Sequence, residues 1–174
     1  ARSTILGLLP TSRRERPTLE RLGETAEHMT SVYRRRLAQA CNGLGWVGRL
    51  TEEELTPLRE QGRRIAGSLL VLIDAPLDHD RQSALGEARS AATEYGRIAA
   101  RGSAEIRETV EAFLCMRMVF LSELAQVSRR RALDTAEATN LLVTATQAMD
   151  ELLVALIHGH ETETAEMSST RGNA

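Results

Sequence analysis

The sequence predicts an all-α protein of about five long helices, arranged as a globin-like fold or a helical bundle. Leu and Ala are its most abundant residues, with 24 and 23 copies, and both belong with Arg and Glu among the strong helix formers. Apolar residues recur at spacings of three and four along most of the chain, which is the period of an amphipathic helix. A length of 174 residues suits one domain.

The first predicted helix follows a polar tail, residues 1–16, and opens at Pro17, a residue favoured in the first turn of a helix. Asn42 and Gly43 supply its stop signal. Trp46 lies in the glycine-rich connection that follows and is expected to cover the end of the core. The apolar stripe of this helix consists of Leu19, Leu22, Ala26, Met29, Tyr33, Leu37 and Ala40.

The second and third helices have clear start signals. Thr51 and Glu54 fit a capping box, the reciprocal pairing that opens many helices. Pro57 leaves two alternatives: a short turn before a new helix capped by Thr56, or a bend in one helix. The third helix is expected to begin at Asp78 or Asp80 and to stop at Arg101 and Gly102, and its face is rich in small residues such as alanine, which permits close approach of another helix.

The fourth helix is predicted to start at a Ser103 cap and to run to about Arg131. Its middle, residues 112–121, is apolar on all sides except at Arg117, as expected for a central helix. Asp134 and Glu137 form an acidic capping pattern at the start of the fifth helix. The domain is expected to span residues 17–161, with residues 162–174 as a linker or tail.

The fifth helix carries an apolar seam at alternating spacings of three and four. Such a seam packs either against a symmetry mate, which would make a homodimer, or against other helices of the same chain. The residues predicted at a dimer interface are Leu142, Ala145, Met149, Leu152 and Leu156.

Arg117 interrupts a face that should be buried, and a buried charge needs a partner. The preferred interpretation is an internal ion pair with a Glu of a neighbouring helix, or contact of the guanidinium with a subunit interface. The alternative is a pocket in which the guanidinium binds a carboxylate or another anion, or which takes a small apolar ligand. The expected lining of that pocket is Arg117 with Trp46, Tyr95, Phe113, Phe120 and Leu121.

Several classes of function are excluded by composition. All 22 basic residues are arginine, so lysine chemistry is absent, and a net charge of -2 argues against nucleic-acid binding. The triple-arginine runs at 34–36 and 129–131 fall at helix ends, where cations complement the helix dipole. The four histidines have no metal-binding spacing, and no catalytic signature occurs. We therefore expect no catalytic residue, no metal ligand and no enzyme, and no cofactor can be named.

The remaining bulk features indicate a cytoplasmic protein. No uncharged apolar run of 18 residues occurs, so no membrane helix is expected. Cys41 and Cys115 lie far apart in predicted helices, which suits buried thiols in a reducing compartment better than a disulfide.

Residues 85–102, followed by 105–124, resemble the helical N-terminal sensor domains of the RsbR type. Such domains occur in stressosome co-antagonists and in some transcription regulators of the PucR type. The shared pattern is a helix that ends in Gly-Arg, Ala and Gly, here Gly96 to Gly102, before a helix with an apolar-Arg-apolar centre. The resemblance implies a globin-like fold without haem, a dimer, and an output module that receives the signal through the last helix.

The expected function is therefore a non-catalytic sensory domain that binds a small molecule or a protein partner and signals through its C-terminal helix. One alternative is a pocketless helical scaffold for dimerisation or interaction. Another is a globin-like sensor of haem or bilin. A cavity smaller than about 100 Å³ would favour the scaffold, because ligand sites are usually several times larger.

Overall fold

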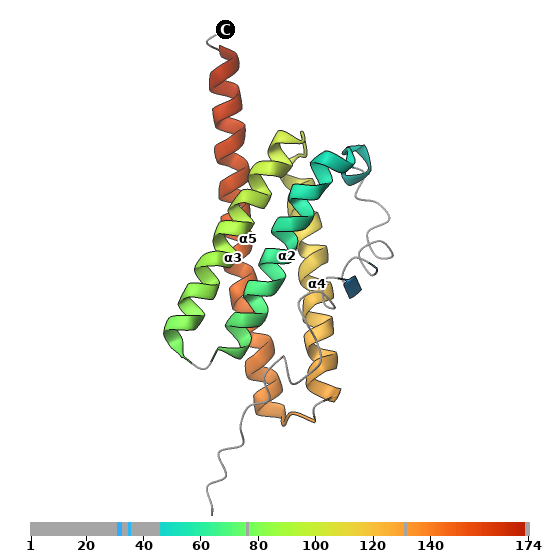
Figure 1. The fold of residues 1–174 in the computed structure, drawn as a ribbon, viewed down its shortest axis with the longest axis vertical. Coiled ribbons are helices and arrows are strands. Elements are labelled where there is room, and N and C mark those ends of the chain that lie inside the picture. The colour runs from blue at the N-terminus through green and yellow to red at the C-terminus, as the bar shows by residue number, and fades with distance from the viewer. Residues whose placement is uncertain (1–30, 33–34, 36–45, 76, 131, 173–174) are drawn as a thin grey trace, which may run out of the picture.

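The computed structural model describes residues 31–32, 35, 46–75, 77–130 and 132–172. Within these ranges the chain is all-α, as predicted, and contains no strand. A short 3-10 helix, η2 (Val47–Arg49), precedes four long helices: α2 (Glu52–Asp74), α3 (Asp78–Arg101), α4 (Ile106–Arg130) and α5 (Thr135–Gly172) (Figure 1). The predicted N-terminal tail and nearly all of the first predicted helix lie outside the described residues.

Two predicted capping boxes are confirmed. The Glu54 amide donates to the Thr51 hydroxyl at 3.3 Å, and the Thr51 amide donates to the Glu54 carboxylate at 2.8 Å. At the start of α5 the Glu137 amide donates to the Asp134 carboxylate at 2.8 Å, and the reverse bond is 3.3 Å long. Both capping boxes can be predicted from the sequence because the paired residues are only three positions apart.

At Pro57 the structure adopts the second alternative, one helix, and at Ser103 it differs from the prediction. No new helix starts at Thr56, since α2 continues through Pro57 and the Thr56 hydroxyl donates to the Glu52 carbonyl instead. The predicted Ser103 cap is wrong. Ser103 has a φ of 59°, a left-handed turn, and α4 begins only at Ile106, after the Glu105 amide donates to the Glu108 carboxylate at 3.0 Å.

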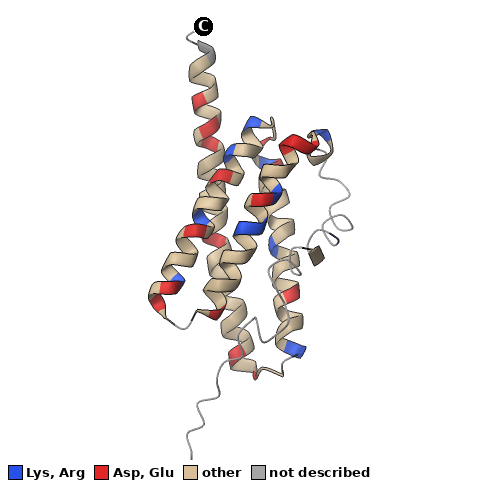
Figure 2. Cartoon of the chain, viewed as in Figure 1, with Lys and Arg blue, Asp and Glu red and all other residues tan. Residues whose placement is uncertain are grey.

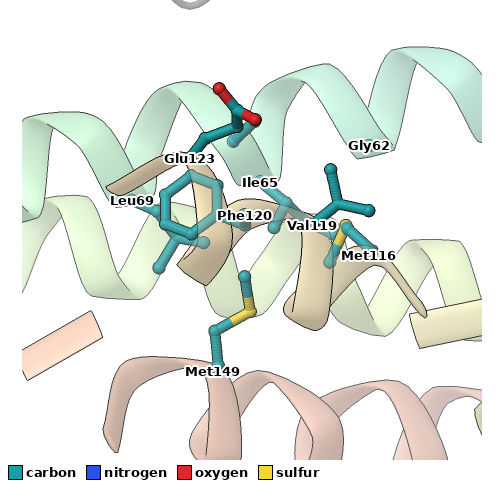
Figure 3. Close-up of a pocket in the computed structure, with 9 residues that line it drawn as sticks. Gly62, Ile65, Leu69, Met116, Val119, Phe120, Glu123 and Met149 are labelled. Atoms are coloured by element: carbon teal, nitrogen blue, oxygen red, sulfur yellow. The ribbon is translucent and has the colours of Figure 1, made fainter. Parts of the chain in front are cut away.

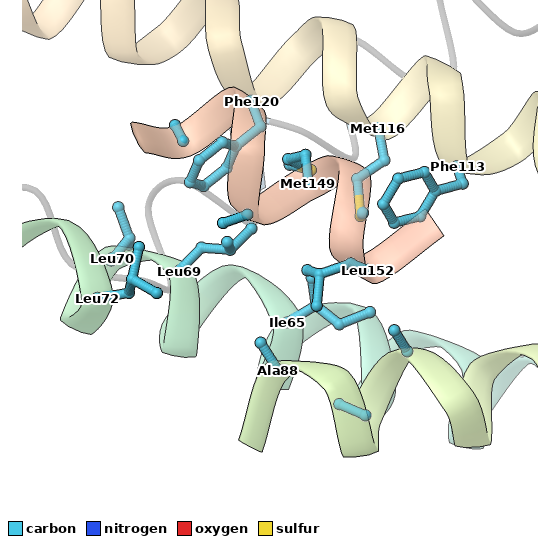
Figure 4. Packing of buried hydrophobic residues seen from close by; sticks show 14 of the residues in the cluster. Ile65, Leu69, Leu70, Leu72, Ala88, Phe113, Met116, Phe120, Met149 and Leu152 are labelled. Carbon is cyan, nitrogen blue, oxygen red and sulfur yellow. The ribbon is translucent and has the colours of Figure 1, made fainter. Parts of the chain in front are cut away.

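The central helix is α5, which contacts α2, α3 and α4. Its apolar side chains fill the middle of the main core, where Met149 and Leu152 are fully buried between Phe120 of α4 and Ile65 of α2 (Figure 4). The prediction that α4 is central is wrong, because one side of α4 faces solvent and leaves Leu114 and Met118 43% and 56% exposed.

The α3 and α5 backbones approach each other closely at two glycines. A Cβ atom at Gly96 would lie 2.1 Å from the Leu156 carbonyl oxygen, and one at Gly159 would lie 2.1 Å from the Thr93 carbonyl oxygen. The alanine-rich face of α3 continues this contact toward its N-terminus. Ion pairs of Arg89 with Glu151 and of Arg101 with Glu163 flank it.

The predicted end of the domain at residue 161 does not coincide with the end of α5, which stays helical to Gly172. This last part projects beyond the other helices (Figure 1) and carries acidic side chains but no described basic one before Arg171 (Figure 2). Hydroxyl groups there donate hydrogen bonds to the backbone carbonyl four residues earlier, as the Thr164 hydroxyl does to the His160 carbonyl at 2.8 Å.

By length and composition alone, Thr135–Thr170 is also a stretch that can cross a membrane, a criterion that core helices of soluble proteins meet as well.

Candidate functional site

Arg117 forms an ion pair with a neighbouring helix, as in the preferred of its two interpretations, but its partner is an aspartate and not the expected glutamate. Its Nη1 lies 2.8 Å from Oδ1 of Asp150, so the pair joins α4 to α5. The expectation of a fully buried charge is wrong, since the Arg117 side chain is 26% exposed and that of Asp150 is 58% exposed. The pair therefore sits on the outer boundary between the two helices, where water solvates both groups.

The six residues predicted to line a pocket are not gathered around one. Phe113 and Phe120 are buried in the main core, and Leu121 packs at its margin. Trp46 belongs to a second cluster at one end of the bundle, and Tyr95 touches both clusters. Arg117 lies on the outer surface, as described above.

Trp46 and Tyr95 are structural in this arrangement. Trp46 is 1% exposed and packs with Leu58, Ala99 and Ala112, so it covers the end of the core as expected. Its indole nitrogen is buried and has no hydrogen-bond partner among the described residues. Burial raises the pKa of the Tyr95 phenol to about 12, so the ring stays neutral at physiological pH.

A cavity of about 20 Å³ lies where α2 and α4 meet over Met149 of α5 (Figure 3). Phe120 is the one predicted ligand residue in its wall. Glu123 is buried at its edge, with the Gln126 amide 3.5 Å from its carboxylate. A volume of this size is about that of a single water probe and far below that of a ligand site. The wall consists of Gly62, Ile65, Ala66, Leu69, Met116, Val119, Phe120, Glu123 and Met149.

The predicted dimer seam on α5 is used inside the chain. Leu142 packs at the margin of the core, whereas Ala145, Met149, Leu152 and Leu156 have no exposed surface. Packing within the chain was one of the two interpretations of this heptad pattern, and it is the one that the fold adopts. A dimer through these side chains would require α5 to leave the bundle.

The exposed apolar surface lies instead on the outer side of α4 and α5. Leu114 and Met118 stand on α4, and Val143 and Val154 stand on α5 with 47% and 68% exposure. Short connections make consecutive helices antiparallel. On α4 the exposed Leu114 and Met118 are four residues apart on either side of Arg117, and on α5 the exposed Val143 and Val154 lie seven residues before and four after Asp150, so each set runs along one side of its helix. We call this surface the α4–α5 face and define it by Leu114, Arg117, Met118, Leu121, Val143, Asp150 and Val154.

Two further residues differ from expectation. His160, expected at a fraying end, is 6% exposed, and its Nε2 lies 2.8 Å from the Ala104 carbonyl oxygen. This bond fastens α5 to the connection between α3 and α4. Cys115 is part of a disulfide, so the prediction of a free thiol is wrong at this position.

Within the described ranges, no group of three or more His, Cys, Asp or Glu side chains could hold a metal ion. No known protein family, curated protein or solved structure matches this chain. Its function must therefore be inferred from its own geometry.

Proposed function

We propose that this chain is a non-catalytic signalling domain that acts through contact with other proteins and not by enclosing a small molecule. The observation that carries the proposal is the α4–α5 face, an exposed apolar surface around one ion pair. The 20 Å³ cavity supports it further, because a haem, a bilin or a typical metabolite needs hundreds of cubic ångströms. Of the expected functions, the pocketless interaction scaffold fits best.

The partner we propose is a second copy of the chain. A two-fold axis through the middle of the α4–α5 face would bring Arg117 of each copy toward Asp150 of its partner, so the charges are self-complementary. The same axis would bury Leu114 and Val154 against their counterparts. This homodimer uses the outer side of α5 and leaves the intrachain seam intact.

The output route we propose is α5 itself. Its last turns project past the bundle, and a rigid helix that emerges from a dimer can pass a change in helix packing to whatever it reaches. The resemblance to RsbR-type sensor domains supports a globin-like arrangement and an output module that receives the signal through this helix. The net charge of -2 supports a role without direct nucleic-acid contact.

Sedimentation equilibrium tests the homodimer with two matched valine variants. Val154→Glu places a charge in the α4–α5 face, where Val154 is 68% exposed. Val71→Glu places the same charge on α2, outside that face, at a valine that is 57% exposed. We expect Val154→Glu to raise the dimer dissociation constant by at least about tenfold, as for a central interface residue. Val71→Glu should leave it unchanged. A wild-type chain that stays monomeric at the highest soluble concentration, or equal behaviour of both variants, would refute the proposal.

A further inference from the structure

Arg97 differs from the two other arginines that α3 carries beside its contact with α5. Arg89 pairs with Glu151 of α5, and Arg101 pairs with Glu163 of α5, whose carboxylate lies 3.4 Å from the Arg101 Nε. Arg97 has no ion pair within the described part of the chain, and its buried Nε atom has no hydrogen-bond partner there. The middle arginine of the three is therefore a cation without an acid.

The place of Arg97 follows from contacts one helical turn before it and one turn after it. Four residues earlier, the Thr93 backbone lies against Gly159 of α5, where an added Cβ would clash. Four residues later, Arg101 reaches Glu163. Because residues four apart on a helix are neighbours, Arg97 lies beside the contact between α3 and α5. The half-buried side chain and the buried Nε agree with this position.

The acids next to Arg97 are already engaged. Arg101 holds the carboxylate of Glu94 at 2.7 Å as well as that of Glu163. A guanidinium keeps its charge at every physiological pH, so Arg97 cannot relieve the missing partner by losing a proton. A buried donor without an acceptor is unfavourable, and an acceptor from solution would remove that penalty.

We propose that Arg97 is the binding residue of an oxyanion site beside the contact of α3 with α5. The ligand is a small oxyanion, for which inorganic phosphate is the probe. The planar edge formed by Nε–H and one Nη–H donates two parallel hydrogen bonds to two oxygens of such an ion. Rotation of the guanidinium about its own side-chain bonds brings this edge toward solvent. The ion is therefore bound at the surface, where it exchanges, and is not enclosed.

The first test is a phosphate titration of the full, 15N-labelled chain at constant ionic strength, with chloride as the replaced ion. The arginine Nε–H signals are followed by nuclear magnetic resonance after triple-resonance assignment. We expect the Arg97 signal to shift with saturation while the other arginine signals stay nearly still. No saturating shift at Arg97, or similar shifts at several arginines, would overturn the proposal. The signal is read whether the chain is a monomer or a dimer, so this outcome is independent of the proposed homodimer.

The second test compares three variants by the phosphate dissociation constant from 31P resonance shifts. Arg97→Gln should raise this constant at least about tenfold, because the charge-assisted pair of bonds is lost. Arg97→Lys keeps the charge but not the planar pair of donors, so it should also bind more weakly than the wild type. Arg63→Gln is the matched control: Arg63 is exposed on α2 and has no ion pair within the described residues, and its loss should leave the constant unchanged. Equal constants for the wild type and Arg97→Gln would show an adventitious ion only and would overturn the site.

Discussion

The close contact of α3 and α5 makes Gly96→Ala the most informative single substitution in the fold. The added methyl carbon would lie 2.1 Å from the Leu156 carbonyl oxygen, so the helices must part by about 0.9 Å to reach even 3.0 Å. Both partners are backbone and cannot rotate away. Overpacking of this kind costs up to about 3 kcal/mol or more, against about 1 kcal/mol gained from the better helix propensity of alanine. We expect a net loss of about 2–3 kcal/mol, or about 5–10 °C in Tm.

Gly86→Ala is the matched control, because this glycine lies on the same helix and has no atom within 4 Å of its added carbon. Helix propensity alone should stabilise that variant by about 0.5–1 kcal/mol. Urea unfolding followed by circular dichroism compares the two. Equal free energies of unfolding for Gly96→Ala and Gly86→Ala would show that the α3–α5 approach is not as close as described, and the reasoning would fail.

Three further predictions concern the core and the pH dependence of stability. Leu152→Ala should lower the free energy of unfolding by about 2–5 kcal/mol because Leu152 is fully buried, whereas Val71→Ala on the exposed side of α2 should change it by less than about 0.5 kcal/mol in the same urea titration. Burial raises the pKa of Tyr95 to about 12, so the unfolded chain loses the phenol proton at a lower pH than the folded chain does. The free energy of unfolding should therefore be unaffected by this group below pH 10 and should fall as the pH rises toward 12. This fall in the free energy of unfolding should reach about 2 kcal/mol in urea titrations at alkaline pH, and Tyr95→Phe should abolish it. Hydrogen bonds from the Thr51 backbone and side chain lower the pKa of the Glu54 carboxyl, so its capping contribution is present above pH 4.5 and lost below that value. Protection factors for amide exchange in the first turn of α2, which are corrected for the intrinsic pH dependence of exchange, should therefore fall in acid for the wild type and stay unchanged in acid for Glu54→Gln.

Local signals in the sequence predict where the helices lie, but they do not predict which helices pack against one another. The caps at Thr51 and Asp134 depend on contacts three residues apart, and both are confirmed. Ser103 carries the same type of signal but adopts a left-handed turn after Gly102, because the chain must reverse tightly between α3 and α4. A capping residue is therefore a reliable sign only where the chain leaves room for an extended N-cap.

The site could be predicted only in part, because periodicity does not say which side of an apolar helix is covered. The run around Arg117 suggests a central helix, yet Leu114 and Met118 face solvent. The seam on α5 suggests a dimer as readily as a core, and packing by three neighbouring helices decides between them. His160 had one overlooked signal: Gly159 beside it lets α3 approach closely enough to bury the ring.

Native mass spectrometry of the gently purified chain tests the central claim most directly, since it reports stoichiometry and any retained small molecule together. The proposed interaction domain predicts a homodimer whose mass is twice that of the 174-residue chain, with nothing else bound. The Val154→Glu chain should then give a monomer under the same conditions. A monomeric wild type that carries one small molecule per chain would contradict the proposal and favour a ligand-binding sensor.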